Sequence, residues 1–307
     1  MSQCDNELTD RELAIATMGV DSAGESISFA EQIRKRRSSL YTPPPGVSFA
    51  EYRETVRFGD STVVERAEEV TVSGVPARKF TPTAEPAGTY VYLHGGGWCL
   101  GSHTGQDAPL QRLSDETSLR VLSIGYRLAP ENPYPEGLRD VLAVIRNVAA
   151  DEPTFLAMGG DSSGAHLAVL ALLELRDNRE RLADAVVLNY GPYDLAGTPS
   201  ASDHLVEPAS MLLPDVARAE LRLPRYSPLY ADLTGMPPAR FAVGTRDYLA
   251  DDTLMLEARW RQVAATELDI VAGAPHAFTA SRTPAARLAR HAERQFLKAG
   301  RERSAVS

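Results

Sequence analysis

The sequence predicts an α/β protein with a mostly parallel sheet that is covered by helices on both faces. Short apolar and β-branched segments alternate with helical patterns over most of the chain. These segments are apolar at nearly every position, as expected for strands buried on both faces, whereas half-exposed strands alternate apolar and polar residues. Alternation of strands and helices is typical of a parallel sheet between two helical layers.

The bulk composition excludes several classes of protein. The chain has 307 residues and a net charge of −9, a balance that disfavours nonspecific binding to nucleic acid or anionic membranes. Its two cysteines, Cys4 and Cys99, cannot form a disulfide framework or a four-thiolate zinc site. Met1–Thr9 lacks the pattern of a signal peptide. The longest apolar run, Leu167–Leu173, is far shorter than the ~18 residues of a membrane helix. We expect a cytoplasmic protein.

The predicted elements begin with a hairpin and continue as strands separated by helices. Val70–Ser73 and Ala77–Phe80 form short strands around a turn at residues 74–76. The buried strands that follow are Thr89–Leu93, Leu119–Ile124, Phe155–Met158, Ala185–Leu188, Arg240–Val243 and Leu268–Val271. The helical patterns are Asp107–Thr117, Pro135–Ala150, Ala165–Arg176, Thr253–Ala265 and Arg287–Leu297.

Two stretches lie outside this alternation. The first contains two helical patterns, Asp10–Met18 and Ser26–Leu40, and ends at a run of three prolines. The second, Tyr190–Pro238, has no clear strand and carries six prolines between residues 192 and 228. A structureless loop of that length is unusual inside a compact domain. We therefore expect a single domain over residues 1–307, with a cap formed by about residues 1–50 and 190–235.

One pentapeptide has the pattern of a nucleophile elbow. Gly160–Gly164 reads G-D-S-S-G, follows a predicted strand and opens a predicted helix. Such a tight turn lifts the central hydroxyl clear of the sheet, and the helix N-terminus favours negative charge that develops beside it. This context predicts Ser162 as a nucleophile. The segment Val20–Gly24 resembles this motif, but it lacks the first glycine and no predicted strand precedes it, so we interpret it as a helix cap.

A glycine-rich loop follows the strand Thr89–Leu93. His94–Trp98 reads H-G-G-G-W, and three glycines let backbone amides turn into a cavity, where they can stabilise an oxyanion. The amide of Ser163, directly after the nucleophile, would complete such an oxyanion hole. No phosphate-binding motif of the P-loop or dinucleotide type accompanies the glycines.

Chain order narrows the choice of base and acid. A nucleophilic serine needs a base, and the base needs an orienting carboxylate. Of the six histidines, one lies in a Gly- and Pro-flanked loop directly after the last strand, and we predict His276 as the base. Asp247 is the first carboxylate after the strand Arg240–Val243, and we predict it as the acid. Asp251 and Asp252 are close rivals for the acid, but Asp252 is also a good N-cap for the helix predicted from Thr253. The other histidines, in less suitable places, are His94, His103, His166, His204 and His291.

Together these motifs resemble the hormone-sensitive lipase-like (bacterial family IV) carboxylesterases of the α/β-hydrolase superfamily. The resemblance extends over Thr89–Phe278 and rests on HGGGW, Y-R-L-A-P-E-N-P-Y-P from Tyr126, GDSSG, G-T-R-D-Y-L-A-D-D from Gly244, and H-A-F from His276. It implies an α/β-hydrolase fold with a cap. It also implies that the amides of Gly95, Gly96 and Ser163 form the oxyanion hole and that His94 holds the glycine loop. Two departures are Ser163, where alanine is usual, and Tyr248, where proline is common.

We therefore expect an esterase for small-molecule esters with short to medium acyl chains, acting through the triad Ser162, Asp247 and His276 without a metal or organic cofactor. Related triads hydrolyse amides or formamides, deacetylate one dedicated metabolite or transfer acyl groups, and these alternatives stay open. Plant gibberellin receptors resemble this family with the histidine lost, so His276 argues against a purely binding role. The natural substrate and the oligomeric state, a homodimer included, are left open.

The sequence leaves the substrate pocket undefined. Apolar residues between Leu205 and Leu223 either line an acyl site or pack on the core, and we favour packing: Met211, Leu212, Leu213, Leu221 and Leu223. Cys99, beside the glycine loop, is interpreted as a small packed residue rather than a second nucleophile.

Overall fold

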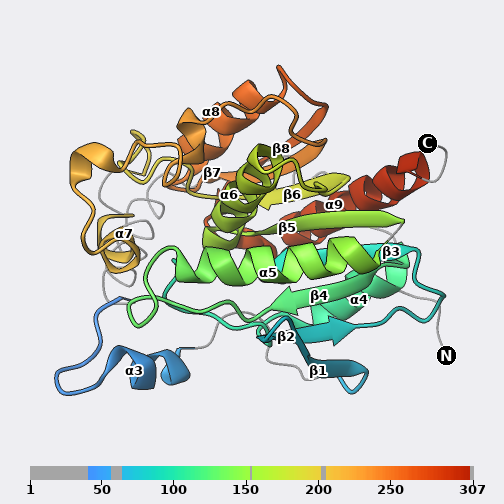
Figure 1. Ribbon diagram of the computed structural model, residues 1–307, viewed down its shortest axis with the longest axis horizontal. Helices are drawn as coiled ribbons and strands as arrows, with labels where there is room; N and C mark the ends of the chain where they lie inside the picture. The colour runs from blue at the N-terminus through green and yellow to red at the C-terminus, as the bar shows by residue number, and fades with distance from the viewer. Residues whose placement is uncertain (1–40, 57–63, 153, 202–204, 305–307) are drawn as a thin grey trace.

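The computed structural model describes residues 41–56, 64–152, 154–201 and 205–304, and the predicted helices Asp10–Met18 and Ser26–Leu40 fall outside these ranges. The described residues form one eight-stranded sheet with the order β1-β2-β4-β3-β5-β6-β7-β8. The predicted mostly parallel α/β fold is confirmed (Figure 1). Its strands are β1 (Ala67–Val72), β2 (Val75–Phe80), β3 (Gly88–Leu93), β4 (Arg120–Ile124), β5 (Phe155–Asp161), β6 (Ala185–Asn189), β7 (Ala239–Arg246) and β8 (Thr266–Pro275).

Strand pairing brings the carboxyl ends of the central strands to one edge of the sheet. β1 and β2 form an antiparallel hairpin, β2 pairs antiparallel with β4, and the other neighbours are parallel. Leu93 of β3 pairs with Gly160 of β5, Asp161 with Asn189 of β6, and Asn189 with Ala242 of β7. Loops that follow these strands therefore start side by side, where parallel α/β sheets bind their ligands.

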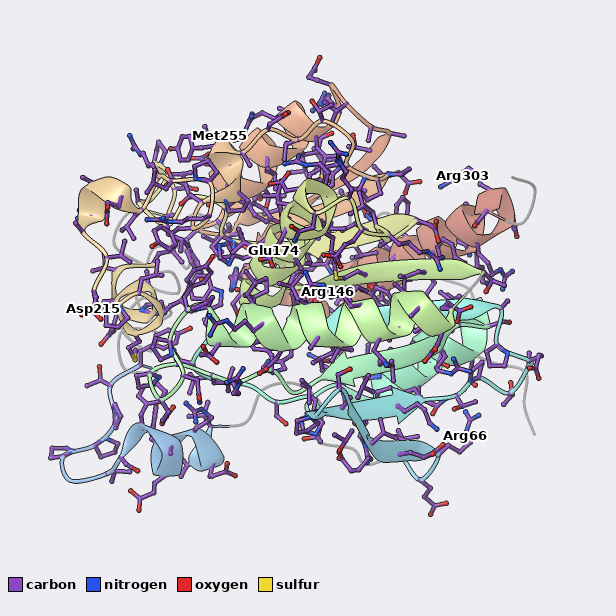
Figure 2. The ribbon with its side chains drawn as sticks, in the orientation of Figure 1. Arg66, Arg146, Glu174, Asp215, Met255 and Arg303 are labelled. Carbon is purple, nitrogen blue, oxygen red and sulfur yellow. The ribbon has the colours of Figure 1, made fainter. Side chains whose placement is uncertain are left out.

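Helices cover both faces of the sheet, because the buried strands are apolar on both sides. One large apolar cluster joins the sheet to α5, α6 and α8, and a second joins the opposite face to α4 and α9 (Figure 1). Arg146 of α5 lies 3.7 Å from Glu174 of α6, an ion pair between neighbouring helices of the first layer (Figure 2). These helices are α4 (Asp107–Thr117), α5 (Glu136–Asp151), α6 (Ser163–Asp177), α8 (Ala250–Trp260) and α9 (Pro284–Ser304).

Several predicted boundaries were wrong: α9 and β8 extend beyond both predicted ends, and the hairpin turn and α8 also differ from the prediction. The hairpin turn is shorter than predicted, because β2 already begins at Val75 and only Ser73 and Gly74, both with positive φ, form the turn. The helix predicted over Thr253–Ala265 is α8, which begins at Ala250 and ends at Trp260. Trp260 is fully buried and its indole N–H donates to the carbonyl of Pro237 at 2.8 Å, so tertiary contacts end the helix before β8.

The segment before β1 contacts the insertion between β6 and β7. As predicted, the described residues of the insertion contain no strand; they form α7 (Val206–Leu212) and the short 3₁₀ helices η2 (Arg218–Glu220) and η3 (Pro228–Tyr230). Thr42 donates to Glu207 of α7 at 3.0 Å. Arg53 of α3 (Phe49–Thr55) donates to the carbonyls of Cys99 at 2.6 Å and Ala129 at 2.9 Å. Within the described residues, no helix combines the length and apolar character needed to cross a membrane.

Candidate active site

Ser162 stands on a sharp turn between β5 and α6. Its backbone angles are φ 53° and ψ −119°, and its N–H donates to the carbonyl of Asn189 at 2.9 Å. A serine with such angles carries backbone strain of roughly 1–3 kcal/mol, as expected of a nucleophile elbow. The turn requires glycine at position 164, because a Cβ there would collide with the carbonyl oxygen of Leu93 and approach that of His94 to 2.6 Å. The predicted strand, turn and helix are therefore present.

A continuous line of hydrogen bonds joins the three predicted triad residues. The Oγ of Ser162 lies 2.9 Å from Nε2 of His276, and Nδ1 of His276 lies 2.9 Å from both carboxylate oxygens of Asp247. Asp247 is 4% exposed, and its Oδ1 also accepts the N–H of Leu249 at 2.8 Å. With the Nδ1 proton directed at Asp247, Nε2 can accept the serine hydroxyl proton.

A register shift between β7 and β8 brings His276 to Asp247. Gly244 pairs with Val271, an offset of 27 residues, whereas Arg246 pairs with Pro275, an offset of 29. Two extra residues in β8 make this bulge, and the N–H of Gly273 within it donates to Oγ1 of Thr245 at 2.9 Å. Asp247 and His276 follow the last paired residues, so they come next to each other at the sheet edge.

The rival carboxylate Asp252 has a structural position, and its prediction as an N-cap was wrong. α8 begins at Ala250, so Asp252 lies in its first turn. It is fully buried and accepts the backbone N–H groups of Tyr193 at 2.6 Å and Asp194 at 2.8 Å and the hydroxyl of Thr198 at 2.5 Å. Burial raises the pKa of Asp252 to about 6 despite these donors. Asp252 thus holds the loop that follows β6.

The glycine loop packs directly against the elbow. A Cβ on Gly95 would lie 3.3 Å from the Cβ of Ser162, and Gly96 has φ +129°, a conformation that favours glycine. Ser163 is the first residue of α6, so its N–H has no partner within the helix. The three residues predicted for an oxyanion hole, Gly95, Gly96 and Ser163, therefore belong to two segments that meet at Ser162.

Two buried neutral histidines hold these segments. The ring of His94 stacks on Tyr126 with centroids 4.4 Å apart, and the Tyr126 hydroxyl donates to the His94 carbonyl at 2.7 Å. The indole N–H of Trp98 donates to Nδ1 of His166 at 3.2 Å, and Nε2 of His166 donates to the carbonyl of Tyr226 in the insertion at 2.8 Å. Burial lowers the pKa of both His94 and His166 to about 4, so both stay neutral and serve as packed hydrogen-bonding groups.

Three other cysteine and histidine residues that the structure describes lie outside the triad. Cys99 is fully buried, and burial raises the pKa of its thiol to about 12, in agreement with its interpretation as a packed residue. His103 pairs with Glu69 at 3.1 Å, and His291 lies on α9. In the parts of the chain that the structure describes, no three His, Cys, Asp or Glu residues gather as a metal site.

Two tyrosines flank His276. The Tyr248 ring lies 4.6 Å from the imidazole, and the Tyr190 ring meets it edge-on at 5.1 Å. From the sequence, Tyr248 was expected only as a departure from the family pattern, and Tyr190 was not predicted as part of the site. The available signal was position: Tyr190 directly follows Asn189 at the end of β6.

Comparisons with known proteins agree with this architecture. A family model described as alpha/beta hydrolase fold matches residues 90–280. An acetyl-hydrolase of Streptomyces hygroscopicus is 34% identical over 207 residues, 63% of this chain and 69% of that protein. An esterase of Acinetobacter venetianus is 28% identical over 196 residues, 60% of this chain and 65% of that protein, so the alignment spans just under two thirds of it. The crystal structure of a hormone-sensitive lipase from a metagenome library is 25% identical with a TM-score of 0.75, covering 87% of this chain and 97% of that chain.

The fold and the hydrogen-bonded serine, histidine and aspartate are the arrangement used by hydrolases that act through a covalent intermediate. The chain belongs to the alpha/beta hydrolase fold family. The predicted resemblance to hormone-sensitive lipase-like enzymes, and with it the predicted class, carboxylesterase, is confirmed.

Proposed function

We propose that this protein hydrolyses carboxylic esters of short to medium acyl chains through an acyl-enzyme intermediate on Ser162. The observation that carries the proposal is the line of hydrogen bonds from Ser162 through His276 to Asp247, with 2.9 Å at each step. The relatives named acetyl-hydrolase and acetyl esterase support the short end of this range. The substrate is a small-molecule ester, and a net charge of −9 supports a role apart from nucleic acid and anionic membranes.

In this proposal the triad residues act in the usual order for a serine hydrolase. His276 takes the hydroxyl proton as Ser162 attacks the ester carbonyl, and Asp247 orients the imidazole and stabilises its cation. The amides of Gly95, Gly96 and Ser163 hold the oxyanion of the tetrahedral intermediate. His276 then protonates the leaving alcohol, and water, activated by the same imidazole, releases the acid from the acyl-enzyme.

We also propose that the chain is one domain with a cap made by about residues 1–50 and 190–235, in a cytoplasmic protein. Support for the cap comes from the contact of Thr42 with Glu207. Met211 of the insertion also packs against the same apolar cluster around Cys99 as Tyr41 and Phe49. Leu212 and Leu213 are buried in the main core, which supports a packing role for these two residues, whereas Leu223 is 40% exposed and does not follow the packing prediction.

The test is turnover of p-nitrophenyl esters from acetate to palmitate by wild type, Ser162→Ala and His276→Ala. Each substitution should lower kcat by about 10⁴- to 10⁶-fold, because removal of a triad member eliminates the nucleophile or its base. His291→Ala, on α9, is the matched histidine control and should stay within about twofold of wild type, as for an ordinary surface residue.

The same experiment separates the proposal from its alternatives. Folded wild type that cleaves none of the esters would exclude a general esterase. Activity on matched p-nitroanilides that exceeds activity on the esters would favour an amidase, the related chemistry on the same triad.

A further inference from the structure

Asn189, the last residue of β6, holds the elbow through both its backbone carbonyl and its side-chain amide. Its carbonyl accepts the N–H of Ser162 at 2.9 Å, and its side-chain amide donates to Oδ1 of Asp161 at 2.9 Å. Asp161 precedes the nucleophile and also accepts the hydroxyl of Tyr92 at 3.0 Å. Asn189 is 6% exposed, so these hydrogen bonds are shielded from competing water. One residue of β6 therefore holds both the backbone N–H of Ser162 and the side chain of the residue that precedes it.

Tyr190, the next residue, reaches the imidazole of His276. Its φ is 41°, an unusual value for a bulky side chain, which persists only when the surroundings enforce it. Its N–H donates to the carbonyl of Ala242 in β7 at 2.8 Å, and its ring meets the His276 ring at 5.1 Å with an interplanar angle of 69°. The strained backbone thus directs the aromatic ring at the proposed base.

The hydroxyl of Tyr190 is anchored on the far side of the ring. It hydrogen bonds Oγ1 of Thr279, in the short helix η4 (Phe278–Ala280) that begins two residues after His276. Tyr190 is 1% exposed, and burial raises its pKa well above the usual value, so the hydroxyl keeps its proton. The hydroxyl end of the side chain is therefore held by the loop that carries His276, while the backbone of Tyr190 is held by β7.

We propose that Tyr190 is a positioning residue, which acts through His276 by fixing the imidazole beside the elbow that Asn189 holds. This inference rests on the proposed function. Asp247 holds the ring at Nδ1, and Tyr248 lies against it with ring centroids 4.6 Å apart. The edge contact of Tyr190 restrains the ring from a further direction, which keeps Nε2 aligned with the serine hydroxyl.

The main test compares Tyr190→Leu with Tyr193→Leu. Misplacement of a reacting group by about 1 Å costs about 10²-fold in rate, so Tyr190→Leu should lower kcat about 10- to 100-fold and leave KM within about threefold. Tyr193 is an equally buried tyrosine three residues along the loop, and it packs in the main core. Tyr193→Leu should lower the melting temperature by a similar amount and leave kcat within about threefold.

A milder pair of variants decides the question where Tyr190→Leu does not fold. Tyr190→Phe and Thr279→Val each remove one hydroxyl of the same hydrogen bond. Each should lower kcat by about 3- to 10-fold, the worth of one buried hydrogen bond. The double variant should be no slower than Tyr190→Phe alone, because Tyr190→Phe already removes the hydrogen bond to Thr279.

Three outcomes would overturn the proposal: unchanged kcat in the Tyr190 variants, an equal loss of kcat in Tyr193→Leu, or additive losses in the double variant. A full loss of activity in Ser162→Ala and His276→Ala alongside any of these would refute the positioning role alone. Retained activity in Ser162→Ala and His276→Ala would instead refute the proposed function.

Discussion

Glu293 of α9 is a buried carboxyl whose effect on stability can be measured by an isosteric change. It is 9% exposed, and the hydroxyl of Tyr90 donates to its Oε1 at 3.4 Å. Burial raises the pKa of Glu293 from 4.5 to about 7, and the negative charge of Asp161 adds to this effect. The positive charges of Arg240 and Arg294 act in the opposite direction. Glu293 and Asp161 line a cavity of about 40 Å³ beneath the elbow.

The sign of the pH dependence follows from this shift. The folded protein binds the proton of Glu293 more tightly than the unfolded chain, so ionisation above pH 4.5 favours unfolding. The effect grows between pH 4.5 and 7 and is complete above pH 7. At 1.36 kcal/mol per pKa unit, the full loss of stability is about 3 kcal/mol.

Glu293→Gln removes the charge and keeps an acceptor for Tyr90. We expect this variant to be about 1–3 kcal/mol more stable than wild type at pH 8 and nearly equal to it at pH 4.5, where the wild-type carboxyl is protonated in the folded state. Urea denaturation at both pH values measures the difference. Glu85→Gln, in an exposed loop, is the control. A Glu293→Gln variant that is less stable than wild type at pH 8, or shifted equally at both pH values, would refute the reasoning.

Three further substitutions or treatments test other parts of the structure. Gly164→Ala should destabilise the protein by about 1–3 kcal/mol, measured by thermal unfolding, because its Cβ would collide with the carbonyl of Leu93; an unchanged melting temperature would contradict this. Thiol reagents at pH 8 should leave activity intact, since Cys99 is buried and its pKa is about 12; inactivation at the rate of Cys99 labelling would argue for a catalytic thiol. Arg53→Ala should lower stability by about 1–2 kcal/mol through the loss of its bonds to two backbone carbonyls, and unfolding in urea that matches wild type would show that α3 is held by other contacts.

The sequence predicted the sheet well because its central strands are buried on both faces. The six residues of β3 are all buried, as are the five of β6, so continuous apolar runs marked them clearly. The hairpin turn and the ends of α8 were predicted less well. The end of the turn depends on the strand pairing of Val75, and the end of α8 depends on the hydrogen bond from the Trp260 indole to the distant carbonyl of Pro237. The local sequence pattern cannot predict either of these tertiary contacts.

The candidate triad could be predicted because each member directly follows a strand of the sheet. Chain order then left one histidine and a small set of carboxylates. The structural role of Asp252 could not be predicted, since its three donors lie 54 to 59 residues away in sequence. Tyr190 was missed for a similar reason. The sequence shows that an aromatic residue follows a strand, but it does not show which side chains its ring will contact in the folded protein.

The pairing of β7 and β8 explains why a spacing of 29 residues between acid and base suits this fold. With the offset of 27 that holds from Ala239 to Gly244, Asp247 would face Ala274 and His276 would lie two positions beyond it. The bulge raises the offset to 29 at Arg246 and Pro275, so the residues that follow both strands become neighbours. A bulge of this kind re-aims a side chain at the rim of a sheet without changing the strands that carry it. The same edge receives Ser162 from β5 and Tyr190 from β6 through an unshifted register. Among the strands that carry the triad and Tyr190, only the pairing of β7 with β8 shifts its register, and the two extra residues lie in β8.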